Sequence, residues 1–580
     1  MIKNFFKKIF KKFPSWNQWK KLPSLLTIKE RYFVLGLIIL IVASLVVWIV
    51  NYQNNNTLLM PKNGGSYTEG IIGSPQYINP ILSQTNDADQ DVVELIFSGL
   101  MKYDSQGNLI PDLAEEYAIG ENGKIYDFFL RKNVKWHDGQ PFTAEDVIFT
   151  IKTIQNPDYR SPLYVNWQGV EIEKIDDYTV RFILSNVYAP FSNNATVGII
   201  PKHIWEKVQP LEFFITEANL QPIGTGPYQF KKIDKDKNGS VSLLELEVNK
   251  NYYLKRPYID NITLKFFINE DLLIEACNRG RIDGLGFVSA QNKLNLINRN
   301  RLNFHQLKLP RYFAIFFNQS KSKALSDKTV RLALNYATNK QEIINEVLGG
   351  EAIAIHTPIP PGVFGYTDKT KIYDFALEHA NNLLDAADWD MNEETQIREK
   401  VLESNEDPTP LEITLVTSEW PELEKVANII KEQWLKVGVR VDVKILSIAE
   451  IQQDYIRPRT YQALLFGEVL GAEPDPFPFW HSSQKRDPGL NLALYQNSDV
   501  DKLLASARET SDLEARKEKY KEFQKLVVED VPVVFLYNPY YLYPVNKKIK
   551  GVEIENISIP SKRFSGIENW YIKTKRIEKK

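Results

Sequence analysis

The sequence predicts an α/β protein that follows a single membrane-spanning helix. Short apolar runs with alternating polar residues, such as residues 178–184, 262–268 and 411–416, are typical of strands. A longer helical pattern over residues 424–437 ends at Gly438 and leads into another strand-like run. Strands and helices therefore alternate along the chain, which predicts lobes built on partly parallel sheets. Near the N-terminus, eighteen consecutive residues without a charge indicate the helix in the membrane.

The length and composition exclude several classes of protein. With 580 residues, 43% hydrophobic and 25% charged, the chain has the length of three or four domains and an ordinary globular composition. A single cysteine, Cys277, excludes an intramolecular disulfide and an all-cysteine metal site. Residues 1–31 hold nine lysines and arginines against one acid, so the remaining chain carries a net charge of −10 within a total of −2. An acidic body of this kind predicts no nucleic-acid partner.

The N-terminal segment, residues 1–32, is basic, and we expect it in the cytoplasm. Up to Pro14 its apolar residues recur at helical spacing opposite lysines, which indicates either a helix on an anionic membrane surface or a simple topogenic tail. Residues 33–50 follow, and a helix of that length would span about 27 Å. Because the basic flank precedes this helix, the main domain is expected outside the cytoplasmic membrane.

Three interpretations of residues 33–50 compete. A cleaved signal peptide would end in small residues, whereas Trp48, Ile49 and Val50 are bulky. A lipoprotein would need a cysteine just after the apolar run, and Cys277 lies far downstream. We therefore expect an uncleaved, single-pass anchor, followed by a polar linker at residues 51–61.

Familiar catalytic motifs are absent from the sequence. The sequence has no G-x-S-x-G, H-E-x-x-H, G-x-x-x-x-G-K-[ST] or G-x-G-x-x-G motif. Its six histidines are scattered without metal-ligand spacing. We therefore expect a protein that is not an enzyme and has no catalytic residues.

One segment, residues 234–245, matches the loop of an EF-hand calcium site. The ligands would be Asp234, Asp236, Asn238, Ser240, Ser242 and Glu245. However, the runs on both sides read as strands, and Asn238-Gly239 between two strands is also a hairpin signal. The sequence leaves both interpretations open, so calcium is a possible cofactor and none is required.

A series of short sequence motifs gives the chain a family resemblance. In order they are GNLIPDLAEEY (107–117), VKWHDGQPFTAEDV (134–147), IGTGPY (223–228), NKNYYLKRPYIDNI (249–262), RGRIDG (279–284), SDKTVRLALNYATNKQEI (326–343) and YDFALEHANNLLDAADW (373–389). Together with Asn79-Pro80 and the PDP at 474–476, they make residues 65–575 resemble the extracellular solute-binding proteins of family 5, the oligopeptide- and dipeptide-binding receptors of ABC importers.

The resemblance implies a two-lobed clamp of the type II periplasmic-binding-protein kind with an extra inserted domain. Mapped onto this chain, the inserted domain covers residues 101–217 and lobe two covers 269–538. Lobe one combines three segments, residues 62–100, 218–268 and 539–575. Two chain crossings would form the hinge, and closure would bury the ligand between the lobes.

The resemblance also implies ligand-binding positions. Members of the family hold a peptide extended, as an added strand, and anchor its ammonium end on an aspartate three positions before the acidic residue of a late acidic-Pro motif. In this chain that position is Ala472, and the nearest acids are Glu473 and Glu468. The other positions carried over are Gln84, Thr85, Asn86, Val469, Leu470, Gly471, Asn491 and Tyr537.

The function that follows is capture of peptides or peptide-like solutes by a membrane-tethered receptor and their delivery to ABC permease subunits. The missing anchor at Ala472 keeps other ligands of the same fold open: nickel complexes, haem or oligosaccharides. A sensory role through the basic tail and a hydrolase built on the same scaffold are the further alternatives.

Overall fold

The computed structural model describes residues 20–21, 26–120, 123–401, 407–471 and 473–578. The chain divides into two compact units, one made of Met1–Lys62 with Lys573–Lys580 and the other of Asn63–Ile572. Most of the basic segment, including its predicted amphipathic helix, lies outside the described residues.

The first unit contains the apolar helix α4, Ile28–Asn56. Within it, Ile28–Ile49 is long and apolar enough to cross a membrane. The linker expected at residues 51–61 is absent, because α4 continues to Asn56 and strand β1 (Thr57–Lys62) pairs antiparallel with β24 (Lys573–Glu578). The sequence between Asn51 and Pro61 contains no glycine or proline that would end the helix or prevent the strand. This pairing also takes residues 573–575 away from the predicted lobe one.

The second unit is built on two large sheets. The seven-stranded sheet has the order β13-β23-β12-β2-β11-β10-β9, and β2 is parallel to both β11 and β12. Its strands are β2 (Ser66–Ile72), β9 (Tyr228–Lys235), β10 (Val241–Val248), β11 (Asn261–Phe267), β12 (Gly284–Leu285), β13 (Leu302–Leu307) and β23 (Tyr541–Asn546). Helices α5 (Asp87–Ile96) and α9 (Glu270–Asn278) pack against this part of the chain.

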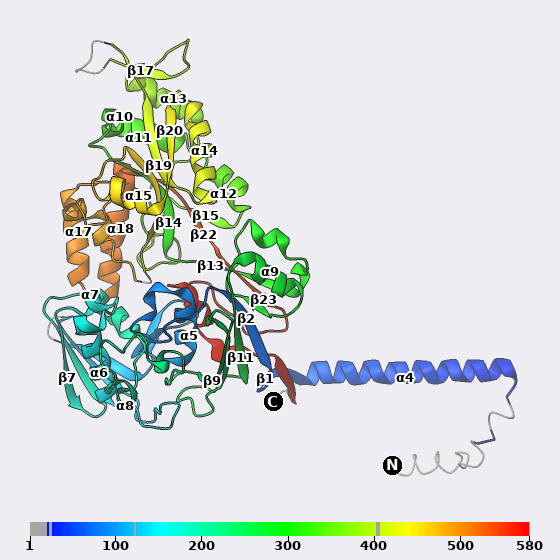
Figure 1. Ribbon diagram of the computed structural model, residues 1–580. Helices are drawn as coiled ribbons and strands as arrows, with labels where there is room; N and C mark the ends of the chain where they lie inside the picture. The colour runs from blue at the N-terminus through cyan, green and yellow to red at the C-terminus, as the bar shows by residue number, and fades with distance from the viewer. Residues whose placement is uncertain (1–19, 22–25, 121–122, 402–406, 472, 579–580) are drawn as a thin grey trace, which may run out of the picture. The chain divides into compact units, whose positions relative to one another are not determined.

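The six-stranded sheet has the order β15-β22-β14-β21-β19-β20. Its strands are β14 (Arg311–Phe317), β15 (Ala352–Ala354), β19 (Glu412–Ser418), β20 (Arg440–Leu446), β21 (Ala463–Val469) and β22 (Val533–Pro539). Because side chains alternate along a strand, β14 sends Phe313 and Ile315 into the core of one face and Tyr312 and Phe316 into the core of the other. Figure 1 shows helices on both sides of this sheet. One face is covered by α11 (Lys328–Tyr336), α12 (Lys340–Leu348), α13 (Leu377–Ala386) and α14 (Pro421–Leu435), and the other by α17 (Ser498–Glu509) and α18 (Leu513–Asp530).

The segment predicted as an inserted domain carries a four-stranded antiparallel sheet of order β5-β6-β8-β7. These strands are β5 (Ala114–Gly120), β6 (Ile125–Leu130), β7 (Val170–Asp176) and β8 (Thr179–Leu184), and the helices are α6 (Ala144–Gln155), α7 (Tyr164–Trp167) and α8 (Lys202–Trp205). Helix α6 begins with a capping box of Thr143 and Asp146.

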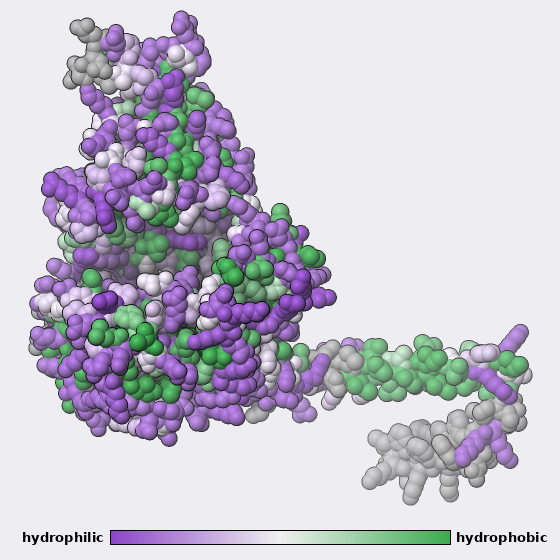
Figure 2. Space-filling view, viewed as in Figure 1, coloured by the Kyte–Doolittle hydropathy of each residue, from purple (hydrophilic) through white to green (hydrophobic). Residues whose placement is uncertain are grey.

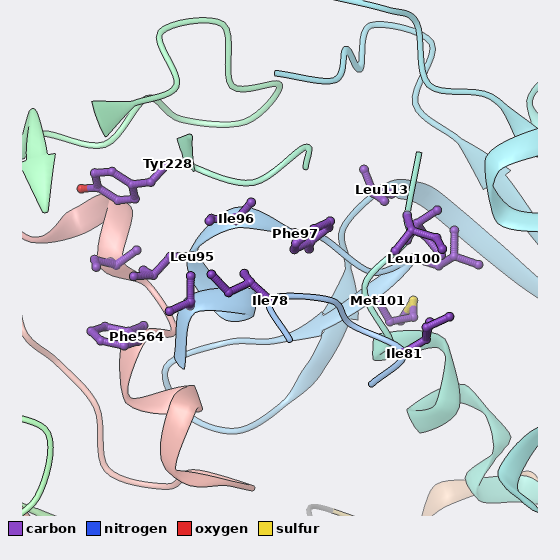
Figure 3. Close-up of a cluster of buried hydrophobic side chains, with 14 of the residues drawn as sticks. Ile78, Ile81, Leu95, Ile96, Phe97, Leu100, Met101, Leu113, Tyr228 and Phe564 are labelled. Atoms are coloured by element: carbon purple, nitrogen blue, oxygen red, sulfur yellow. The ribbon is translucent and has the colours of Figure 1, made fainter. Parts of the chain in front are cut away.

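The core of this segment is continuous with the core under α5. Figure 3 shows Leu100, Met101 and Leu113 beside Ile96 and Phe97. Tyr228 of β9 and Phe564 close to the C-terminus belong to the same buried cluster. The inserted segment therefore shares one hydrophobic core with the seven-stranded sheet.

The remaining strands and α-helices are short. They are β3 (Met101–Tyr103), β4 (Leu109–Pro111), β16 (Asp390–Met391), β17 (Arg398–Lys400), β18 (Thr409–Pro410), α10 (Lys323–Ser326), α15 (Ile448–Glu450) and α16 (Phe477–Trp480).

The described chain passes between the two large sheets at two places. The first is residues 308–310, between β13 and β14, and the second is Tyr540, between β22 and β23. The Asn538 side-chain amide donates to the carbonyl of Leu309 over 2.9 Å and ties the two crossings together. Sheet membership places the first crossing later than the predicted boundary at 268/269, because β12 and β13 extend the first sheet. The division into named lobes stays a prediction.

Candidate ligand-binding cleft

The cleft lies where the two large sheets meet. Figure 2 shows the visible face of residues 63–572 hollowed between the part that carries the six-stranded sheet and the part that carries the seven-stranded sheet. Strand β21 ends here at Val469, whose side chain is 64% exposed although most of the strand is buried. Its register partner on β14 is Arg311. Residues directly opposite each other in a sheet share a face, so Val469 and Arg311 lie together on the side of the six-stranded sheet covered by α14.

The loop after β21 contains the other predicted ligand contacts. The amide of Leu470 donates to the carbonyl of Pro310 over 2.7 Å, and the Leu470 side chain is buried. Gly471 has φ of +81° with open space around it, a backbone conformation that disfavours a side chain. Ala472 lies outside the described residues.

Glu473 already has partners within the protein. Its carboxylate pairs with Arg516 of α18, whose side chain is 2% exposed, and accepts a 2.6 Å hydrogen bond from Asn193 Nδ2. Burial raises the pKa of Glu473, and Arg516 and Asn193 counteract this. A ligand ammonium at Glu473 would therefore compete with an existing cation.

The contact with Asn193 also joins distant parts of the chain. Tyr103 of β3 donates to Asn193 Oδ1 over 2.6 Å, so a chain of hydrogen bonds runs from β3 through Asn193 to Glu473 and α18. This linkage connects the inserted segment to the six-stranded half of the unit.

Glu468 is the second acid near the missing anchor. It is 4% exposed and accepts a hydrogen bond from the hydroxyl of Tyr312. Burial raises the pKa of Glu468 to about 8, so this side chain keeps its proton at neutral pH. A neutral carboxyl group cannot balance the charge of an ammonium group. Neither Glu468 nor Glu473 thus offers a free anion in place of the missing aspartate.

The predicted positions 84–86 lie at the start of α5. Asn86 caps this helix, because its Oδ1 accepts from the amide of Ala88 over 2.9 Å while its Nδ2 donates to the carbonyl of Ser74 over 3.0 Å. Gln84 donates to the carbonyl of Pro80 and lines a cavity of about 210 Å³, together with Asn193. Thr85 is exposed. Asn86 therefore has a structural role, and Gln84 and Thr85 remain available to a ligand.

Asn491 and Tyr537 differ in their surroundings. Asn491 is fully buried and bonds to the backbones of His481 and Tyr495, so its side chain holds this loop together. Tyr537, on β22, stacks on Phe313 at 5.2 Å and donates to Glu422 Oε1 over 3.2 Å.

The structure adds three residues that sequence reasoning missed. They are Arg311, Glu422 in the first turn of α14 and Tyr541 of β23; Glu422 and Tyr541, like Tyr537, interact electrostatically with Arg311. The available signals were local: Arg311 opens the run RYFAIFF, and Glu422 follows the proline that begins a helix. Neither signal shows that the two residues meet.

The segment 234–245 forms a hairpin between β9 and β10 and does not gather calcium ligands. Asp236 Oδ1 accepts from the amides of Asn238 and Ser240, at 2.8 and 3.0 Å. Asp234 pairs with Lys232 at 2.8 Å, and Glu245 lies on β10 opposite Lys232. Among the described residues, no group of three or more His, Cys, Asp or Glu side chains is arranged to hold a metal ion. The donor set therefore does not fit calcium in this conformation.

Two sheets joined by two crossings, with helices on both faces of the second sheet, define a two-lobed α/β solute-binding protein. The chain belongs to the bacterial extracellular solute-binding proteins of family 5, whose middle-region model matches residues 108–489. The predicted fold class and family are thus confirmed.

Several relatives extend the match along the chain. The oligopeptide-binding protein AppA of Bacillus subtilis (strain 168) is 29% identical over 520 residues, covering 88% of this chain and 92% of AppA. The solved structure of AppA with a nonapeptide has a TM-score of 0.64 and 28% identity, covering 88% of this chain and 99% of that one. The dipeptide-binding protein of Escherichia coli (strain K12) is 27% identical over 530 residues, covering 84% and 93%. NikZ from Campylobacter jejuni, solved with Ni(L-His), has a TM-score of 0.67 and 28% identity, covering 88% and 100%.

Proposed function

We propose that this chain is a receptor that captures peptides or peptide-like solutes outside the cytoplasmic membrane and delivers them to an ABC permease. The observation that carries the proposal is its likeness to AppA, which extends over 88% of this chain and includes a structure with a nonapeptide. Family membership further supports a binding protein that performs no chemistry on its ligand.

The edge of β21 supports extended binding of a peptide. Strand β19 pairs with β21 only at Ala463 and Leu464, whereas β14 pairs with it as far as Val469. Among the described residues, the β19 side of residues 465–469 therefore carries no strand partner. An extended peptide can add its backbone there, with its side chains directed into the hollow of Figure 2.

The two crossings supply the movement that such a receptor needs. Residues 308–310 and Tyr540 are short connections, so the sheets can rotate about them without disrupting either core. A ligand that contacts both halves stabilises the closed form, and that form is what a permease would distinguish from the empty receptor.

The tether is the second part of the proposal. Helix α4 contains one apolar span and follows a basic segment, which supports a single-pass anchor with residues 1–32 inside the cell. The same span is also compatible with a signal peptide. In the sensory alternative, the basic segment would contact a partner without transport.

The test of ligand class is native mass spectrometry of the full chain, purified in detergent, before and after unfolding. We expect masses that match peptides to be released, and synthetic tetrapeptides and nonapeptides to bind in calorimetry. Release of a nickel complex or haem, with no peptide binding, would overturn the proposal. A nickel complex would be the kind of ligand present in the NikZ structure.

The test of delivery is co-purification from the membranes of the source cell. The importer role requires permease subunits with the receptor, whereas a sensor would bring other partners. A peptide library recovered intact after incubation is the result expected of a receptor, and cleaved peptides would indicate a hydrolase.

A further inference from the structure

A second cavity lies in the six-stranded half, at the end away from the cleft. Strand β14 begins at Arg311 beside the cleft and ends at Phe317, and β21 pairs with it in the opposite direction. Residues 319–320, which follow β14, and residues 457–459, which precede β21, line a cavity of about 980 Å³. The six residue steps of β14 span roughly 20 Å, so this cavity is separate from the cleft.

The lining of this cavity is positively charged, although the chain after residue 31 carries a net charge of −10. Five basic side chains line it against those of Asp487 and Asp530, which gives a net charge of +3. A concave surface of one sign concentrates the electrostatic potential and attracts ions of the opposite sign. The basic side chains are Arg331, Arg457, Arg459, Lys485 and Arg486.

Two of the arginines are fixed in the wall. Arg331 is 4% exposed and donates to four backbone carbonyls. Arg459 is 7% exposed and donates to three backbone carbonyls over 2.6–3.0 Å. These neutral carbonyls orient the guanidinium groups without cancelling their charge. A guanidinium has five N–H donors, so both arginines keep donors for a ligand.

Two other arginines are exposed. Arg457 follows η8 (Ile451–Ile456), a π-helical turn of a kind that is frequent at functional sites, and Arg486 lies in the loop before α17. Within the described residues, neither guanidinium has a hydrogen-bond or ion-pair partner. Asp530, in contrast, already accepts from the Tyr495 hydroxyl over 2.6 Å. The cavity therefore combines oriented, buried cations with exposed cations that can close on an anion.

We propose that this cavity binds the phosphate groups of an organic phosphate, either free in solution or in a lipid headgroup. Arginine is the residue best suited to phosphate, because its parallel N–H donors match two phosphate oxygens. The cavity volume is at the upper end of the range for small-molecule sites, which leaves room for more than one phosphate group or for an organic part. Pro458 and Leu494 offer apolar surface to that part.

The site is independent of the proposed peptide capture. All of its lining residues lie between the two crossings, within residues 319–530, and belong to one half of the unit. Binding of a phosphate therefore requires no closure of the cleft.

The experiment measures the affinity of the full chain in detergent for pyrophosphate, by calorimetry at low salt. Arg457→Gln and Arg486→Gln should each weaken binding by about 10-fold, and the double variant by about 100-fold, since each removes hydrogen bonds to a charged group. Neither side chain has a partner in the described protein, so the Tm should stay unchanged. Arg440→Gln is the matched control, because Arg440 is exposed and paired with Glu412; it should bind pyrophosphate as the unmodified chain does.

Lipid added to the detergent identifies the source of the phosphate. Displacement of pyrophosphate by phosphatidylglycerol, and not by phosphatidylcholine, would assign the site to an anionic lipid headgroup. Pyrophosphate that stays bound would assign it to a soluble phosphate.

Three results would overturn the inference. They are no binding of pyrophosphate, equal binding by the double variant, and equal binding of sulfate, which would show attraction of any anion. Each would leave the peptide receptor unaffected, whereas loss of peptide binding alone would contradict the proposed function and leave the phosphate site in place.

Discussion

Glu468 shows how burial controls the charge of a single residue in this receptor. Its pKa rises to about 8 because it is buried inside the six-stranded half, where the Tyr312 hydroxyl is its only side-chain hydrogen-bond partner among the described residues. An unfolded chain would ionise the same group near its ordinary value of 4.5. Between these two values the folded state binds more protons, so the stability from this group falls as the pH rises from about 4.5 to 8.

Glu468→Gln should therefore remove this pH-dependent loss of stability. The amide stays neutral and its oxygen still accepts from Tyr312, so we expect the variant to be more stable than the unmodified chain at pH 8, by roughly 4 kcal/mol, and similar at pH 4.5. Thermal or urea unfolding across this pH range measures the effect. Glu419→Gln, at an exposed position, is the control and should keep the original slope. An unchanged slope in Glu468→Gln would show that Glu468 is ionised in the folded protein.

Residue types could be predicted from the sequence, whereas residue partners could not. The large apolar side chains Trp136 and Phe142 in the motif at 134–147 are buried, as their residue types favour. Glu473 reads as a candidate anion for the ligand, yet Arg516, 43 positions further on, holds its carboxylate. That contact depends on the packing of α18 against the loop after β21, and no local pattern encodes it. The same reason hides the neighbourhood of Arg311.

At the scale of elements, periodicity and caps predict secondary structure well where tertiary packing agrees with local preference. The strands expected at 178–184, 262–268 and 411–416 are β8, β11 and β19, and the helix that ends before Gly438 is α14. The prediction of an irregular linker at 51–61 is wrong, because strand β1 is stabilised by pairing with β24 from the far end of the chain. The pattern of neighbouring residues cannot predict such a pairing.

The hairpin of β9 and β10 gives a test of the two interpretations of residues 234–245. If Asp236 serves the turn, Asp236→Ala should lower the stability by about 1 kcal/mol through loss of two backbone hydrogen bonds. Asp236→Asn should be nearly neutral, since its amide oxygen can still accept both. Thermal unfolding of the full chain with millimolar calcium or a chelator measures this, and we expect no calcium effect. A rise in Tm with calcium that Asp236→Asn abolishes would establish a calcium site.

At the scale of the whole molecule, the family's sequence motifs predict the two-lobed fold but not the path of the chain between its sheets. The order β13-β23-β12-β2-β11-β10-β9 places the short strand β12 between β23 and β2. Two residues, Gly284 and Leu285, carry no periodic pattern, so the sequence boundary at 269 precedes the structural crossing at 308–310. That crossing leads directly into β14, so Arg311 lies at the junction of the two halves.

The N-terminal anchor decides whether the receptor stays attached to the cell. Helix α4 continues from Ile28 to Asn56 through the point where a signal peptide would be cleaved, and Trp48 and Val50 occupy the positions that need small residues. We expect the mass of the membrane-bound protein to include residues 1–50, and alkaline extraction to leave it in the membrane. The double substitution Trp48→Ala and Val50→Ala creates an A-x-A site before Asn51 and should release a shorter protein. If the unmodified chain is already shortened near residue 51 and found in the medium, the tether is wrong, while the cleft and its ligand would be unaffected.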